Sequence, residues 1–204
     1  MLSFENTEIA FKSKTNKDLN RAYWLFKIIS SSKMVSIGKW LTNVALKMHL
    51  PIKGIIKKTI FKQFCGGENI AQCSQKIEDL GAFGIGTILD YSVEGQTSNE
   101  AFEETTNEII ATIHRAKESK HIPFAVFKVT GISRFEILVK SNTDEDSLSE
   151  SEKKELEEVK ERINRICKVG YDSGVPVFID AEESWIQDVI DRISYLMMLK
   201  YNQE

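Results

Sequence analysis

The sequence lacks the features that mark an exported or membrane-spanning protein. Its three cysteines, Cys65, Cys73 and Cys167, form no CxxC pair and leave an odd thiol, which argues for structural thiols in a reducing compartment. No apolar stretch approaches the roughly 20 residues that a membrane-spanning helix needs. Residues 1–10 contain two glutamates and no positively charged signal-peptide start. We therefore expect a cytoplasmic protein, with at most a peripheral contact at the inner face of the membrane.

Two kinds of binding motif are also missing. His49, His114 and His121 have no partner at metal-ligand spacing, so we expect no metal site. Gly84 and Gly86 stand at the start of the first predicted strand, not behind it. The Gly-rich phosphate turn of a nucleotide-binding doubly wound sheet is therefore absent.

What is present is typical of a globular protein, with 42% hydrophobic and 28% charged residues in a chain of 204. Residues 1–82 hold 13 Lys and Arg against 6 Asp and Glu, a net charge of +7, whereas the remainder has a net charge of −10. A basic front half raises the question of an anionic partner such as nucleic acid, phosphate or a membrane surface. We favour the simpler interpretation, that these lysines solvate helix faces, and expect no nucleic-acid partner.

Hydrophobic periodicity divides the chain into a helical front and an alternating remainder. Residues 18–64 show apolar positions three or four apart, and a short helix is expected from Asn69 to Gly81. Strands are then predicted at 85–91, 124–129 and 175–181. The helices between and after them are expected to begin at three pairs of capping residues: Thr97 with Glu100, Ser149 with Glu152, and Ser184 with Gln187. The acidic segment 141–152 is predicted to be a solvated loop.

A β-α-β-α-β-α order predicts an α/β fold with a parallel sheet and right-handed crossovers. The choice lies between an open doubly wound sheet and part of a barrel, and the missing Gly-rich turn favours the barrel. We expect a partial (β/α)8 TIM barrel, comprising its first three βα units, at residues 83–204. An N-terminal helical arm at residues 1–82 would precede it.

Each predicted strand ends in ionisable residues, where ligands bind in both architectures. The three strand ends are 90–94 (Asp-Tyr-Ser-Val-Glu), 128–130 (Lys-Val-Thr) and 180–183 (Asp-Ala-Glu-Glu). Taken singly, each could be a helix cap or a loop ion pair. Lys128 is the sharpest case, because a lysine within an apolar strand is costly to bury unless it is paired or lines a cleft. If Lys128 and Asp180 both face the barrel mouth, they can pair and keep each other charged.

These three strand ends resemble the proline dehydrogenase family. The matching segments are 88–94 (Ile-Leu-Asp-Tyr-Ser-Val-Glu), 127–131 (Phe-Lys-Val-Thr-Gly) and 178–185 (Phe-Ile-Asp-Ala-Glu-Glu-Ser-Trp), with Gln187. The resemblance covers about residues 60–204. It implies a (β/α)8 barrel holding FAD, which oxidises L-proline to Δ1-pyrroline-5-carboxylate in proline catabolism and passes electrons to a membrane quinone.

The resemblance also implies roles for individual residues. Lys128 matches the family's second-strand lysine and is expected to act as a catalytic residue that binds the substrate carboxylate. Asp180 matches the third-strand aspartate, expected to be catalytic, close to the flavin and in contact with that lysine. Asp180, Ala181 and Thr130 are the expected cofactor-binding residues.

Further family motifs, which lie beyond the third strand, do not occur before Glu204. We therefore expect this chain alone to be an inactive fragment, which lacks the C-terminal half, does not retain FAD and tends to self-associate through open sheet edges. Two alternatives remain. One is a different barrel enzyme in which Lys128 forms a Schiff base, and the other is a non-catalytic interaction module derived from a barrel half.

Overall fold

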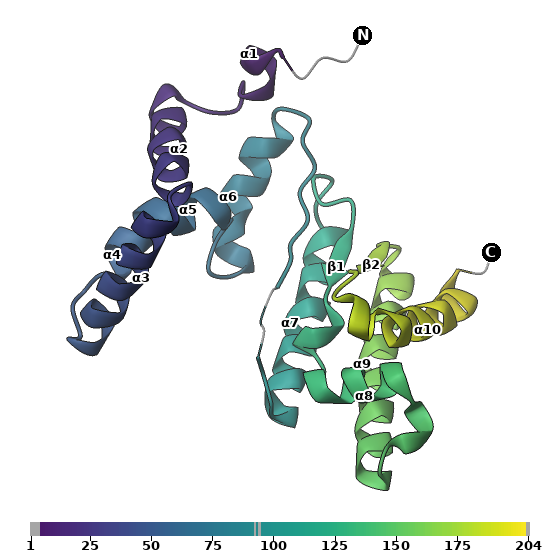
Figure 1. The fold of residues 1–204 in the computed structure, drawn as a ribbon. Helices are drawn as coiled ribbons and strands as arrows, with labels where there is room; N and C mark the ends of the chain where they lie inside the picture. The colour runs from purple at the N-terminus through teal and green to yellow at the C-terminus, as the bar shows by residue number, and fades with distance from the viewer. Residues whose placement is uncertain (1–4, 92, 94, 203–204) are drawn as a thin grey trace. The chain divides into compact units, whose positions relative to one another are not determined.

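The computed structural model describes residues 5–91, 93 and 95–202. They fall into two compact units, unit 1 (Met1–Phe83) and unit 2 (Gly84–Glu204). The chain is mostly helical, and the described residues contain one two-stranded sheet, in unit 2 (Figure 1). Within the predicted segment 90–94, Ser92 and Glu94 lie outside the described residues.

Unit 1 is a succession of helices, as the periodicity of residues 18–64 predicts. Its elements are α1 (Thr7–Ala10), α2 (Asn16–Ile29), α3 (Ser32–Lys47), α4 (Lys53–Ile56), the π-helical segment η1 (Lys57–Phe61), α5 (Lys62–Phe64) and α6 (Ile70–Gly81). The side chain of Asn69 accepts a hydrogen bond from the Gln72 amide, so α6 begins where it is expected.

Unit 1 buries little of its own apolar surface. Among its described residues, Ile77 is the one buried hydrophobic side chain, with 2% of its surface exposed. Phe26 and Phe64 meet edge to face with ring centroids 5.9 Å apart, which joins α2 to α5. The hydrophobic core of the chain therefore lies in unit 2.

Unit 2 has a helix before, between and after its two strands. Its elements are α7 (Asn99–Lys117), β1 (Ala125–Phe127), the 3-10 turn η2 (Val129–Gly131), α8 (Phe135–Thr143), the 3-10 turn η3 (Glu145–Ser147), α9 (Glu150–Ser173), β2 (Val177–Ile179) and α10 (Ser184–Tyr201). The capping box of Ser149 and Glu152 opens α9 as predicted. Gly174 ends it in the left-handed conformation, with φ +66°.

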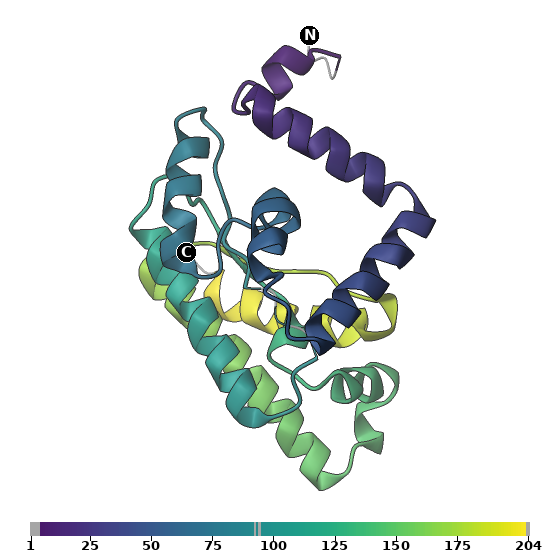
Figure 2. The same cartoon turned by 90° about the vertical axis from the view of Figure 1, so that its left-hand side faces the viewer.

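The two strands are parallel neighbours, and each β1 residue pairs with the residue 52 positions later in β2: Ala125 with Val177, Val126 with Phe178, and Phe127 with Ile179. Helices α7 and α9 lie side by side next to the sheet, as both views show (Figure 2). Their facing apolar residues, such as Ile109, Ile113 and Ile163, are at most 1% exposed. Phe127 is fully buried, so β1 is anchored in this core.

The strand predicted at 85–91 is not formed, so two of the three predicted strands are present. The Thr87 amide donates to the His121 carbonyl oxygen at 2.8 Å, which ties the segment to the chain before β1. Gly86, one residue before Thr87, lies close to Pro123: a β-carbon placed on this glycine would be 3.3 Å from the proline ring carbons. This contact does not develop into a strand, and residues 85–91 have no regular secondary structure.

Two predicted helix caps are displaced. Ser98, not Thr97, caps α7 by accepting from the Ala101 amide at 3.2 Å. Serine and threonine both cap helices, and hydrophobic periodicity does not locate a helix end to within one residue. Ser184 lies inside α10, whose N-cap, Glu183, makes no side-chain capping bond.

The acidic segment 141–152 is more ordered than its composition predicts. It contains the end of α8, the turn η3 and the start of α9. Cations from other elements neutralise it: Lys140 pairs with Glu152, and Lys160 and Arg192 both pair with Glu145. These partners are distant in sequence or on the next element, so the local composition does not reveal them.

A β-carbon at Gly170 tests the close approach of α9 to β2. In Gly170→Ala the new carbon would stand 2.4 Å from Val177 Cγ2 and 3.1 Å from the Val175 carbonyl oxygen. We expect the free energy of unfolding to fall by about 2 kcal/mol, because the short valine side chain and the backbone have little room to move. Urea denaturation measures this. Glu161→Ala on the exposed face of α9 is the control and should change stability by less than about 0.5 kcal/mol.

Candidate active site at the carboxyl ends of β1 and β2

Lys128 and Asp180 directly follow the two strands and meet at the carboxyl edge of the sheet. The Asp180 amide donates to the Phe127 carbonyl oxygen at 3.0 Å, which continues the ladder by one bond. Lys128 Nζ lies 2.5 Å from Asp180 Oδ2, in a charge-assisted hydrogen bond. The side chains are 28% and 46% exposed, so the pair stands at the surface of the sheet end with its lysine largely covered.

The surroundings of Lys128 favour its charged form. The hydrogen bond with Asp180 raises the pKa of Lys128 above its ordinary value and outweighs burial, which acts in the opposite direction. The negative charges of Asp180, Glu182 and Asp90 add to the increase. A Schiff-base lysine needs a lowered pKa so that the neutral amine can attack a carbonyl. The surroundings therefore favour a charged lysine paired with a carboxylate over a neutral amine.

A second pair of side chains joins the same two loops. The Thr130 amide donates to Glu182 Oε1 at 3.0 Å, and the Thr130 hydroxyl donates to Glu182 Oε2. The Glu182 amide in turn donates to the side-chain oxygen of Gln187 at 2.8 Å. Gln187, expected as a capping partner of Ser184, thus secures the segment that leads into α10.

The structure accounts for each predicted site residue. Lys128 and Asp180 are in contact, whereas Thr130 faces Glu182, and Ala181 is exposed beside Asp180. The roles assigned to these four residues stay predictions. The sequence places Glu182 at the end of the third predicted strand but gives it no role. Glu182 follows Asp180 by two residues, just as Thr130 follows Lys128 by two. This matched spacing is the signal that could have identified Glu182.

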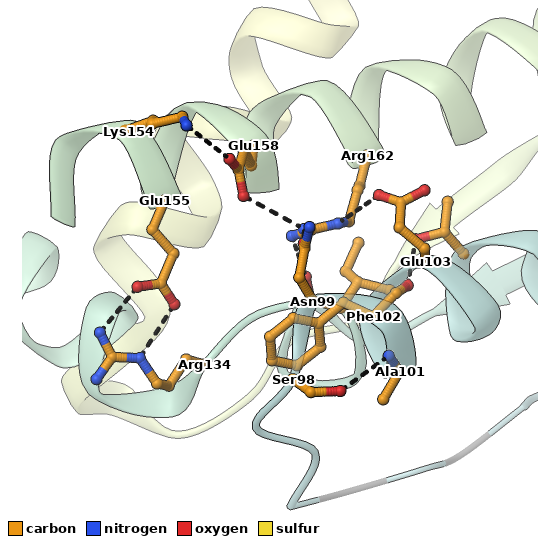
Figure 3. Close-up of polar contacts among 12 residues, drawn as sticks. Ser98, Asn99, Ala101, Phe102, Glu103, Arg134, Lys154, Glu155, Glu158 and Arg162 are labelled. Carbon is orange, nitrogen blue, oxygen red and sulfur yellow. Dashed lines mark hydrogen bonds and ion pairs between the residues drawn. The ribbon is translucent and has the colours of Figure 1, made fainter. Parts of the chain in front are cut away.

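Arg162 on α9 is the centre of a different polar cluster (Figure 3). Its side chain is 3% exposed, and its guanidinium donates to Glu103 Oε1 at 2.9 Å, to the Ile132 carbonyl oxygen at 3.1 Å and to the side chain of Asn99. The guanidinium also lies over the Phe102 ring, 5.3 Å from its centroid.

The contacts of this cluster join helices to one another. Each guanidinium nitrogen of Arg162 already has a protein acceptor, and Arg165 holds the second oxygen of Glu103 at 2.7 Å. Beside it, Arg134 and Glu155 form a bidentate pair at 3.0 and 2.8 Å (Figure 3). Because each nitrogen of this buried cation meets an acceptor from another part of unit 2, we assign the Arg162 cluster to the architecture of the unit.

The described residues contain no group of three or more His, Cys, Asp and Glu side chains arranged to hold a metal ion. Within the same part of the chain, no helix combines the length and apolarity that crossing a bilayer requires.

The carboxyl-edge pair lies within a segment that a family profile matches. The profile described as Proline dehydrogenase covers residues 73–204, which is well over half of the chain. The chain belongs to the proline dehydrogenase family. The resemblance of the strand-end motifs is thereby confirmed.

Relatives within this family match between half of the chain and nearly all of it. Proline dehydrogenase 1, mitochondrial, of Dictyostelium discoideum is 28% identical over an aligned length of 237. The alignment covers 98% of this chain and 41% of the relative. The Caenorhabditis elegans protein of the same name is 38% identical over 108 residues, which cover 51% of this chain and 17% of the relative. The chain thus spans about two fifths of the length of the Dictyostelium relative.

A solved structure shares the fold. The crystal structure of proline utilization A (PutA) from Bdellovibrio bacteriovorus, inactivated by N-propargylglycine, superposes with a TM-score of 0.55. It matches 94% of this chain and 21% of that chain at 13% identity. At that identity the likeness concerns the fold alone, and it supports a mostly helical α/β arrangement.

The expected location, cytoplasmic with at most a peripheral contact at the inner face of the membrane, is wrong. The Dictyostelium, Arabidopsis thaliana and Caenorhabditis elegans relatives in the proline dehydrogenase family are all named mitochondrial. Unpaired thiols report the redox conditions of a compartment and do not identify the compartment.

Replacing Asp180 by Asn should lower the pKa of Lys128. The variant removes the strongest stabilisation of the ammonium form, so the amine becomes neutral at lower pH and is acetylated faster at a given pH. Site-resolved mass spectrometry of acetylation against pH measures the shift. Asp146→Asn, at an exposed position, is the control and should leave Lys128 unchanged. An unaltered profile in Asp180→Asn would contradict the pairing.

Glu103→Gln should reduce the pH dependence of stability. Burial acts to raise the pKa of Glu103, but hydrogen bonds from Arg165 and Arg162 outweigh it and lower that pKa. The carboxylate's contribution is therefore present above the ordinary value of about 4.3 and is lost as pH falls through the lowered value. We expect the wild type to exceed the variant by on the order of 1 kcal/mol at pH 7, since Glu103 is partly exposed. Urea titrations at pH 7 and pH 3 check that this difference shrinks in acid.

Proposed function

We propose that this chain is the N-terminal portion of a flavin-dependent proline dehydrogenase, which oxidises L-proline to Δ1-pyrroline-5-carboxylate in proline catabolism. The ion pair of Lys128 and Asp180 carries the proposal, because it stands at the carboxyl ends of two parallel strands inside the segment matched by the family profile. In barrel enzymes this end of the strands holds the active site.

In this proposal Lys128 binds the carboxylate of proline. Its raised pKa keeps the ammonium charged at neutral pH, which suits an anion clamp. Asp180 fixes the ammonium in place and supplies a counter-charge when no substrate is bound. FAD, when bound, supplies the acceptor for the hydride that leaves proline.

The residues at the carboxyl edge fit one side of a flavin nucleotide. The Thr130 hydroxyl oxygen and the Asp180 carboxylate can accept hydrogen bonds, the Thr130 proton being donated to Glu182, and Ala181 is small and exposed. These residues come from two adjacent loops, however, and the remaining sides of such a large cofactor need further loops. We therefore propose that the complete enzyme holds FAD and that this chain alone does not.

The exposed apolar surface of unit 2 supports an incomplete barrel. In a closed parallel barrel both faces of every strand are covered. Here Phe178, in the middle of β2, is 46% exposed and stacks on Phe124 with centroids 4.5 Å apart. On α10, Trp185 and Leu196 are also exposed. We propose that residues 83–204 are the first part of a (β/α)8 barrel, that residues 1–82 form its helical arm, and that a C-terminal half covers this surface.

The proposed partners follow from this function. They are L-proline, a quinone as electron acceptor, and the missing C-terminal half, in whose absence self-association through the open edge of β2 is expected. The names of the relatives support a mitochondrial location.

Flavin content and proline-dependent dye reduction test the function. We expect neither from the 204-residue chain, and both from a longer product that includes the coding sequence immediately downstream. In the longer product, Lys128→Ala should lower kcat/KM for proline by about 100-fold, as does loss of one charge-stabilising group in other enzymes.

Lys153→Ala is the matched control, because this lysine is exposed on α9. Its kcat/KM should equal that of the parent. Stoichiometric flavin and proline oxidation by the 204-residue chain would overturn the proposed incompleteness. If the longer product contains no flavin and does not reduce the dye with proline, the proposed reaction is overturned and a non-catalytic interaction module is favoured.

A further inference from the structure

The register of the sheet continues beyond the strands through side chains. The backbone pairs of β1 and β2 are 52 residues apart, and so are Lys128 with Asp180 and Thr130 with Glu182. Both contacts join the segment that directly follows β1 to the segment that directly follows β2. The residues on either side of Lys128, Phe127 and Val129, are fully buried.

Glu182 satisfies donors that the local backbone leaves open. After Lys128 the chain turns into η2, whose first amides have no partner within the turn and which has no side-chain cap of its own. Glu182 accepts from both the amide and the hydroxyl of Thr130. A carboxylate from a loop 52 residues away thus acts as the missing cap of this turn.

Glu182 is itself held from α10. Its amide donates to the side-chain oxygen of Gln187 at 2.8 Å, and the Gln187 side-chain nitrogen donates to Asp191 Oδ1 at 2.6 Å. Ile186 and Val189, on the same helical turns, are at most 1% exposed, so this part of α10 is fixed in the core. The chain of contacts therefore runs from a packed helix to the turn that follows Lys128.

We propose that Glu182 is a positioning residue, which clamps the turn at Thr130 and so keeps the Lys128 side chain directed at Asp180. A lysine has four rotatable side-chain bonds, and its ion pair with a partly exposed aspartate restrains only the far end. The clamp restrains the backbone from which the side chain departs. The inference deepens the proposed function, on which it rests for the identity of the anion that Lys128 binds.

Two readouts on the 204-residue chain test the clamp without substrate or flavin: hydrogen exchange of the Thr130 amide, and the acetylation rate of Lys128. In Glu182→Ala we expect Thr130 exchange to accelerate by about tenfold or more and Lys128 acetylation to rise. Glu182→Gln keeps an acceptor for the amide, and its NH2 group can donate to the Thr130 hydroxyl. It should therefore restore both readouts to within about threefold of the wild type.

The glutamine variant separates geometry from charge. If Glu182 acted on Lys128 only as a nearby negative charge, Glu182→Gln would behave like Glu182→Ala, and the positioning role would be overturned. An unchanged Thr130 amide in Glu182→Ala would overturn it as well. Asp188→Ala, which removes an exposed carboxylate one residue beyond Gln187, is the control and should alter neither readout.

Thr130→Val tests the same contact from its other side, in case Glu182→Ala fails to fold. It keeps the amide and the Glu182 charge but loses the hydroxyl, so we expect an intermediate gain in amide exchange, and no gain would contradict the clamp. In a proline-oxidising longer product, Glu182→Ala should raise KM for proline by about tenfold with a smaller change in kcat. If the longer product is inactive while the amide readouts change as expected, the positioning role stands and the proposed reaction is lost.

Discussion

The parallel pairing of β1 with β2 is the constraint on which the candidate site depends. Three residue pairs set a spacing of 52, and this spacing brings Lys128 to Asp180 and Thr130 to Glu182. A slip by one residue would turn Lys128 toward the position of the fully buried Phe127. The cost of burying that charge specifies the register. The packing of α7 and α9 holds β1 in place, so a short sheet is enough to fix the site.

Two cations in unit 2, Arg162 and Lys128, differ in how deeply they are buried and in which groups they pair with. Arg162 is buried between α7 and α9, and each of its guanidinium nitrogens donates to an acceptor within unit 2. Its hydrogen bonds therefore join helices. Lys128 stands at an edge that is partly open, with Asp180 as its direct partner and two further carboxylates nearby. Nearby carboxylates favour its charged form, and its side chain is more exposed than that of Arg162.

Elements set by local sequence were predicted well, and those set by distant partners were not. The capping box of Ser149 and Glu152 and the start of α6 at Asn69 were both predicted, because each depends on residues three apart. The strand at 85–91 was wrongly predicted because an apolar run indicates that a segment can be buried and does not show whether a neighbouring strand pairs with it. The acidic segment 141–152 was mistaken for a loop because its neutralising cations include Lys160 and Arg192.

The sequence by itself determined the helical periods, the alternation of strands and helices in unit 2, and the motifs that link the chain to the proline dehydrogenase family. It also indicated that Lys128 and Asp180 would meet, since both end strands of one parallel sheet. Only the tertiary structure decided that Glu182 receives both donors of Thr130 and that Gln187 secures Glu182. The physical reason is that an exact register and the packing of α10 select one carboxylate among several, and no local pattern encodes that selection.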